Sequence, residues 1–260
     1  MSRAVSVLIL VTACGGGEGA RPDAAAAADA GSRDAANDAG GLPLDGFGAI
    51  TGDCDVLDDE LTAAGPSWFE SSIEFAAPFT GEEAGQLTAG GQEMLADGNA
   101  GGSSLYSEVF SFELLARCEL APLVKTETEI DYDQEGAITD LLVAVDGEKI
   151  GVSVTRAVGY PFDDPYTVEQ AREILERKLA GILESTAHVS EADRWRKQIL
   201  AVVAYAPGHV DALSAAWGAI PAETRADTIV WVLVTEGADD FIYCDGPCPA
   251  FTAPRSGARS

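Results

Sequence analysis

Basic side chains are scarce in this sequence. Its 260 residues include 16 Lys and Arg against 43 Asp and Glu, so the formal net charge is -27 at pH 7. A polyanion meeting such a surface finds few cations to replace its counterions. The composition therefore argues against nucleic acid and anionic lipid as partners. A local positive spot made by Arg117, Lys149 and Arg156 is the exception to consider.

Histidine is nearly as rare, since the chain has only His188 and His209. Neither stands in a His-Glu-x-x-His spacing, and the chain has no Gly-x-Ser-x-Gly turn and no Gly-rich phosphate loop after a strand. We expect His188 near a helix end and His209 in a loop, both in structural roles. The signatures of a histidine metal site, a nucleophile elbow and a phosphate loop are thus missing, although a Ser-His-Asp triad of distant residues stays open.

Long apolar runs are absent too. The run from Ala4 to Thr12 is too short to span a bilayer but suits a cleaved export signal. It ends in Val11-Thr12-Ala13-Cys14, which resembles a bacterial lipobox whose Cys is acylated and becomes the new N-terminus. Gly15 does not favour retention at the inner membrane. We expect a lipoprotein signal peptide at 1–13, a lipid on Cys14 and anchorage in the bacterial cell envelope, at the outer membrane. The alternative is an ordinary signal peptide in which Cys14 is incidental.

Large apolar residues are sparse in residues 14–48, which consist mostly of Gly, Ala, Asp and Asn. Such a segment cannot bury enough surface to offset its ordering entropy and predicts a flexible tether. Residues 49–245 suffice for one globular domain, and 246–260, rich in Pro, Gly and Ser, predict a flexible tail. Removing residues 1–13 takes away only Arg3 among the charges, so -27 becomes -28 for the mature chain.

The strongest local signal is a β-hairpin. Two apolar runs, 141–145 and 150–154, flank Asp146-Gly147, a dipeptide that favours a tight hairpin turn. The pleat places Ile150, Val152 and Val154 on one face. Gly151, Ser153 and Thr155 lie on the other, which is small and polar where a core would need bulk. That small polar face is where we expect function.

Periodicity predicts further elements around the hairpin. A short helix at 93–96 interrupts a Gly-rich loop, and Thr167 with Gln170 forms a capping box for a long helix. Elsewhere, apolar spacing predicts a helix at 104–121, strands at 124–132, 199–205 and 228–235, and a helix at 211–220. The fold class is α/β, a mixed central sheet with flanking helices in the order α-β-β-β-α-β-α-β.

This order resembles the restriction-endonuclease-like superfamily, the PD-D/E-x-K nucleases, over residues 104–235. In that family an Asp begins the second strand, and an acidic-x-Lys triplet follows on the third; the carboxylates hold a divalent metal that activates water. Asp140 occupies the Asp position, and Glu108 stands where some members add an acidic ligand. The triplet falls on Ser153-Val154-Thr155, so the resemblance implies a vestigial site of Asp140, Glu108, Ser153 and Thr155, with no metal and no cofactor. Asp140 is alternatively a turn or strand-start residue.

An acidic cluster, Asp53, Asp55, Asp58, Asp59 and Glu60, raises the possibility of calcium. It lacks the Gly and terminal Glu of an EF-hand loop, so a solvated face is favoured. The charged residues at 172, 173 and 176–178 are likewise interpreted as the solvent-exposed face of their helix.

Four cysteines besides Cys14 form an even set: Cys54, Cys118, Cys244 and Cys248. In an exported protein an even number indicates disulfides, with three possible pairings. The turn between Cys244 and Cys248 favours a local bridge and leaves Cys54 for Cys118. A zinc site of four thiols is the rival.

Together these features predict an envelope-anchored lipoprotein whose domain is a non-catalytic, nuclease-like binding or structural module. Its partners would be the membrane, through the N-terminal lipid, and a protein or small molecule that the sequence does not identify. The alternatives are a metal-dependent nuclease or related hydrolase, and a calcium-dependent envelope module.

Overall fold

The computed structural model describes residues 42–44, 46–159, 161–162 and 165–244. The predicted signal peptide, Cys14 and the tail 246–260 lie outside these residues. Within them, one sheet has the strand order β1-β2-β3-β8-β7-β6-β5-β4. Its strands are β1 (Leu42–Pro43), β2 (Gly48–Gly52), β3 (Ser67–Phe75), β4 (Leu123–Thr126), β5 (Leu141–Val145), β6 (Glu148–Ala157), β7 (Lys197–Ala204) and β8 (Ile229–Gly237).

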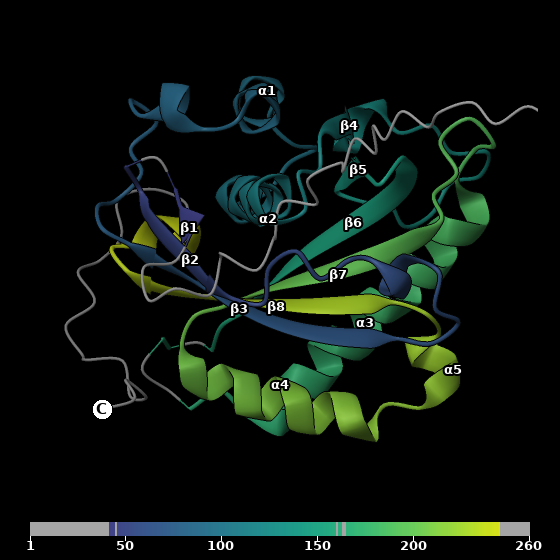
Figure 1. Cartoon of the computed structure of the whole chain (residues 1–260). Helices are drawn as coiled ribbons and strands as arrows, with labels where there is room; N and C mark the ends of the chain where they lie inside the picture. The colour runs from purple at the N-terminus through teal and green to yellow at the C-terminus, as the bar shows by residue number, and fades with distance from the viewer. Residues whose placement is uncertain (1–41, 45, 160, 163–164, 245–260) are drawn as a thin grey trace, which may run out of the picture. The chain divides into compact units, whose positions relative to one another are not determined.

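The centre of the sheet is parallel and both edges are antiparallel. Strands β3, β8, β7 and β6 pair in parallel, whereas β4 and β5 extend one edge and β1 and β2 the other. Helices cover both faces, as Figure 1 shows, with α1 and α2 on one side and α3, α4 and α5 on the other. Their bounds are α1 (Ala89–Asp97), α2 (Leu105–Cys118), α3 (Val168–His188), α4 (Pro207–Ala219) and α5 (Ala222–Arg225). The mixed α/β fold class is confirmed, and from α2 to β8 the predicted order holds with α5 added.

The predicted hairpin is present as β5 and β6. Asp146 and Gly147 have φ of 49° and 83°, the left-handed values that a type I′ turn requires. Val145 pairs with Glu148 across the turn. Ile150 and Val152 are fully buried in the core beneath α2. The local turn chemistry therefore specifies the register of this edge of the sheet.

Helix α3 also begins where the capping box predicts. The Thr167 backbone N–H donates to Gln170 Oε1 at 2.8 Å, and the Gln170 N–H donates to Thr167 Oγ1 at 3.3 Å. Two orphan N–H groups of the first turn are thus satisfied by side chains. Leu175 and Leu179 are fully buried against the sheet.

The N-terminal third of the sheet was not predicted. Strand β3 alternates buried Ser71, Ile73 and Phe75 with exposed Glu70 and Glu74. It pairs in parallel with β8, far along the chain, so no local turn signals it.

The predicted boundary between tether and domain at residue 48 also differs from the structure. Leu44 and Phe47 are buried in the core, and β1 pairs with β2. The folded part therefore extends into the segment expected to be a tether.

Two predicted elements change character. The strand expected at 124–132 ends at Thr126, and a 3-10 turn follows at Glu127–Glu129. There the Thr126 backbone N–H donates to Glu129 Oε2 at 2.9 Å, so a local side chain replaces a strand partner. The helix expected from residue 211 starts at Pro207, because proline suits the first turn of a helix. His209, expected in a loop, lies in α4, and its Nδ1 donates to the Ala157 carbonyl at 2.8 Å.

Candidate functional site

Asp140 lies directly before β5 and is tied into the hairpin. Its backbone N–H donates to the Val152 carbonyl at 3.1 Å, and its Oδ2 accepts from the Val154 N–H at 2.6 Å. Lys178 on α3 places Nζ 3.9 Å from the same oxygen. Burial raises the pKa of Asp140, while Lys178 and the Val154 N–H act in the opposite direction. One carboxylate oxygen therefore already has a backbone donor and a cation.

Glu108 on α2 is the second predicted acid, and only 3% of it is exposed. Burial raises the pKa of Glu108 to about 7, and the negative charges of Asp140 and Glu127 add to the rise. Hydrogen bonds from Ser104 and Asn99 oppose it; the Asn99 Nδ2 lies 3.4 Å from Glu108 Oε1. The charge of Asp140 is thus one of the influences on the pKa of Glu108.

These acids do not assemble into a larger ligand set. Within the described ranges, three metal-ligating groups come within 4.8 Å of one another at Glu93, Asp97 and Glu129, all exposed. Neither Glu108 nor Asp140 belongs to such a group. A hard divalent cation needs several oxygen ligands, so two acids held by other partners form a weak site.

Ser153 and Thr155, the remaining vestigial candidates, are 4% and 9% exposed. They lie on the α3 side of the sheet. Gln198 lies on the same side and makes side-chain contacts with several hydroxyl groups there. Ser153 Oγ lies 3.5 Å from Gln198 Oε1, and Gln198 Nε2 donates to Ser185 Oγ at 2.9 Å. Thr139 Oγ1 donates to Ser185 Oγ at 3.1 Å. The small polar face expected to carry function is therefore buried beneath α3, where Ser153 joins a hydrogen-bond network around Gln198.

Lys178 is the residue that sequence reasoning misplaced. The charge pattern predicts Lys178 on the solvent-exposed face of α3, where Arg172 and Glu176 form an ion pair at 2.8 Å. Lys178 instead faces Asp140 with 30% of its side chain exposed. The signal was available, because position 178 is three residues after Leu175 and four before Ile182, both buried. Helical periodicity therefore places it beside the apolar stripe.

The three cations considered for a positive spot are each engaged inside the domain. Arg117 Nε donates to Glu113 Oε2 at 2.9 Å. Lys149 Nζ donates to the Ala192 carbonyl at 2.6 Å, and Arg156 donates to the carbonyls of Ser103 and Ile242. These contacts hold loops and strand ends, so the three side chains do not form one exposed basic surface.

The acidic cluster of Asp53, Asp55, Asp58, Asp59 and Glu60 does not supply a group of three converging carboxylates in the described residues. None of its five members belongs to the three-carboxylate group found in the described residues. Asp53 instead accepts the Glu70 backbone N–H at 2.8 Å, which joins the loop to β3. The convergence that a calcium-dependent module requires is not seen at these residues.

One predicted disulfide is present between Cys54 and Cys118, whose Cα atoms lie 4.8 Å apart. Beside it, Glu119 accepts the backbone N–H groups of Val56 and Leu57 at 3.0 and 3.2 Å. The loop after β2 is therefore fastened to the end of α2 twice. Cys244 is also disulfide-bonded, and its expected partner Cys248 lies outside the described residues.

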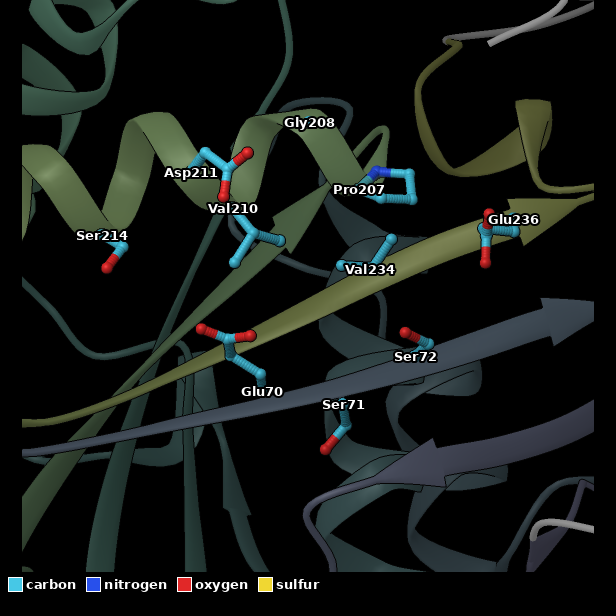
Figure 2. Close-up of a pocket in the computed structure, with 10 residues that line it drawn as sticks. All are labelled: Glu70, Ser71, Ser72, Pro207, Gly208, Val210, Asp211, Ser214, Val234 and Glu236. Carbon is cyan, nitrogen blue, oxygen red and sulfur yellow. The ribbon is translucent and has the colours of Figure 1, made fainter. Parts of the chain in front are cut away.

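A separate hollow of about 660 Å³ lies between α4 and strands β3 and β8. Figure 2 shows the side chains of Val210 and Glu70 directed into the space between the helix and the strands. Its acidic lining residues are Glu70, Asp211 and Glu236, its hydroxyls include Ser72 and Ser214, and its apolar residues are Pro207, Val210 and Val234. No sequence motif indicated this groove, because its walls come from three distant segments.

Comparisons with known proteins place few constraints on function. The chain matches no protein-family model. It is 41% identical over 152 residues to the AAC-rich mRNA clone AAC4 protein of Dictyostelium discoideum, a match covering 56% of this chain and 22% of that protein. The chain thus spans under a quarter of that relative.

Among solved structures, Pyrococcus furiosus SfsA in complex with Ca²⁺ matches 51% of this chain and 56% of its own, with 12% identity and a TM-score of 0.26. So low a score supports no inference about function. In the described part of the chain, no helix has the length and apolar character needed to cross a membrane.

Proposed function

We propose that this chain is a lipid-anchored protein of the bacterial cell envelope whose nuclease-like domain is a non-catalytic binding or structural module. The observation that carries the proposal is the burial of Ser153 and Thr155 beneath α3. These positions correspond to the acid and the lysine of the superfamily triplet. Neutral hydroxyls at these two positions supply neither a carboxylate for a metal ion nor a cation for a phosphate.

The surroundings of Asp140 support the same role. Its Oδ2 accepts the Val154 N–H and lies near the Lys178 ammonium, which disfavours a second cation at that oxygen. This is the environment of a strand-start acid that organises the hairpin. The strongly negative net charge also opposes a polyanionic substrate.

A nuclease assay tests whether the domain lacks catalytic activity toward nucleic acids. Purified full-length protein carrying Cys14→Ser is incubated with single- and double-stranded DNA and with RNA, in magnesium or manganese, beside an Asp140→Ala variant. We expect no cleavage in either protein. Cleavage that disappears with Asp140→Ala would refute the non-catalytic role.

A metal-dependent nuclease or related hydrolase is the second candidate. The observation in its favour is that Glu108 and Asp140 interact and that Lys178 lies beside Asp140. Two carboxylates and an ammonium are the groups such chemistry uses. Cleavage abolished separately by Glu108→Gln and by Lys178→Met would establish this candidate; inactivity of the parent protein removes it.

The anchor is tested at Cys14. Acyl chains on the new N-terminus would bind a bilayer firmly when two or more act together. Protein from an exporting bacterial host should enter the detergent phase on phase separation, and Cys14→Ser should shift it to the aqueous phase. Parent protein found entirely in the aqueous phase after export contradicts lipidation.

A further inference from the structure

One face of β3 is only partly covered by a helix. Glu70 and Glu74 are exposed on that face and Ser72 is half-buried, whereas the opposite face is buried in the core. Helix α4 packs over β7 and β8 through residues such as Leu213 and reaches β3 at Trp68, which lies beside Trp217. The groove of about 660 Å³ lies between α4 and the part of β3 that follows Trp68.

The groove carries unneutralised negative charge. Of its lining carboxylates, Glu70 accepts a hydrogen bond from the neutral Trp68 indole at 2.7 Å. In the described part of the chain no ion pair engages Glu70, Asp211 or Glu236, and no Lys or Arg lines the groove. The three carboxylates line a space open to solvent and attract cations.

The rest of the lining selects among cations. Pro207, Val210 and Val234 offer apolar surface, which suits the aliphatic stem of a long basic side chain. Ser72 and Ser214 add hydroxyls able to hydrogen-bond a peptide backbone. No three carboxylates of the groove approach within 4.8 Å of one another among the described residues, so a bare metal ion is poorly matched.

The adjacent surface already accepts a guanidinium. Trp68, which bonds Glu70, lies 5.9 Å from Trp217 between ring centroids. The guanidinium carbon of Arg225 lies 5.2 Å from the centre of the Trp217 ring. Indole rings attract cations through their negative faces. The indoles of Trp68 and Trp217 therefore connect Glu70 at the groove with the Arg225 guanidinium.

We propose that this groove binds an extended, Lys- and Arg-containing segment of a partner protein. Charge complementarity requires a positively charged partner. The apolar lining residues favour basic side chains with long aliphatic stems. The proposal rests on the proposed role as a binding module and names its partner class. The interaction should be salt-dependent, because its charges stay near solvent.

The test uses the full-length Cys14→Ser protein and a fluorescent peptide of about ten alternating Lys and Ser residues, with a Glu-Ser peptide as the probe of opposite charge. Binding is followed by fluorescence anisotropy at about 50 and about 150 mM salt. The Lys-Ser peptide should bind, more weakly at the higher salt, and the Glu-Ser peptide should not. Failure of the Lys-Ser peptide to bind would overturn the proposal.

Two sets of variants separate the groove from net charge. Glu70→Gln, Asp211→Asn and Glu236→Gln together should weaken binding roughly tenfold or more. The matched control, Glu82→Gln, Asp133→Asn and Glu135→Gln, removes the same charge from exposed positions elsewhere and should change affinity less than about twofold. Equal losses in both triple variants would show non-specific attraction and overturn the proposal.

A single variant gives an independent readout. Ser214 is exposed on α4, so Ser214→Arg places a cation in the groove without disturbing the core. It should lower affinity at an unchanged melting temperature; unchanged affinity would count against the groove. If the peptide does not bind and the nuclease assay is negative, only the proposal of peptide binding in the groove is refuted. Cleavage activity would instead refute the non-catalytic role.

Discussion

Lys178 Nζ lies 3.9 Å from Asp140 Oδ2, so a helix on one face of the sheet supplies the counter-charge for the acid that starts the hairpin. Sixteen per cent of the Asp140 side chain is exposed, and its carboxylate also accepts the Val154 N–H. The pair joins α3 to the β5–β6 edge. It explains how this acid persists at a half-buried position.

The first prediction concerns that pair. Lys178 lowers the pKa of Asp140, so Lys178→Met should raise that pKa further and make the ionised acid costlier. The free energy of unfolding should fall by about 1 kcal/mol at pH 8 and by less at acid pH, where Asp140 is protonated. Urea unfolding at both pH values measures this. The neighbouring, exposed Arg177→Met serves as the control; an equal loss in the two variants would argue against the pair.

The second prediction concerns Glu108, whose pKa rises from 4.5 to about 7 mainly through burial. The pKa of Glu108 is higher in the folded state than in the unfolded state. The contribution of Glu108 to the free energy of unfolding is therefore fully present below pH 4.5 and is lost as the pH rises through about 7. At pH 8 the ionisation cost is on the order of 3 kcal/mol. Glu108→Gln should remove this part of the pH dependence, as urea unfolding across pH 4 to 8 would show. A Gln variant with an unchanged pH profile would contradict it.

The third prediction concerns the buried polar face. Ser153→Glu introduces an acid where the nuclease resemblance would expect one, and it places a charge in the Gln198 network beneath α3. We expect destabilisation of at least about 3 kcal/mol and no gain of metal binding. Chemical denaturation and calorimetric titration with magnesium measure the two effects. A stable Ser153→Glu protein that binds magnesium would show that this face is accessible after all.

The fourth prediction concerns Lys197, which is 3% exposed. Its Nζ donates to the carbonyls of Glu60, Ala63 and Gly65 at 2.7, 2.9 and 3.1 Å, so one ammonium fastens the loop before β3 to β7. Lys197→Met should cost about 3 kcal/mol, because all three charge-assisted hydrogen bonds are lost.

Arg196→Met provides the matched control for Lys197→Met. Arg196 is exposed at the adjacent position, so its replacement should stay within about 0.5 kcal/mol of the parent. Thermal and urea unfolding of the two variants would be compared. Similar losses would mean that the ammonium does not carry the effect.

The fifth prediction concerns the disulfide between Cys54 and Cys118, which closes a loop with a sequence separation of 64. Loop-closure entropy of the unfolded chain gives about 4 kcal/mol for such a bridge. The double variant Cys54→Ala and Cys118→Ala should unfold at correspondingly lower urea, while Glu119 still holds Val56 and Leu57. Equal urea midpoints for parent and double variant would contradict this stabilisation.

Elements with local signals could be predicted from the amino-acid sequence. Asp146-Gly147 specifies the hairpin, the Thr167 and Gln170 side chains cap α3, and apolar spacing outlines β7 and β8. Such signals act between neighbours in the chain, where turn chemistry and periodicity decide the backbone. The mixed α/β class follows from their order.

The roles of the polar residues, in contrast, depend on long-range packing. Whether Ser153 faces a cleft or a helix depends on how α3 packs, and no local pattern encodes the distance from Lys178 to Asp140. Strand β3 finds its partner β8 across most of the chain, and the acidic groove exists because these strands meet α4. Long-range packing, which balances burial against unsatisfied polar groups, determines these arrangements and hence the candidate site.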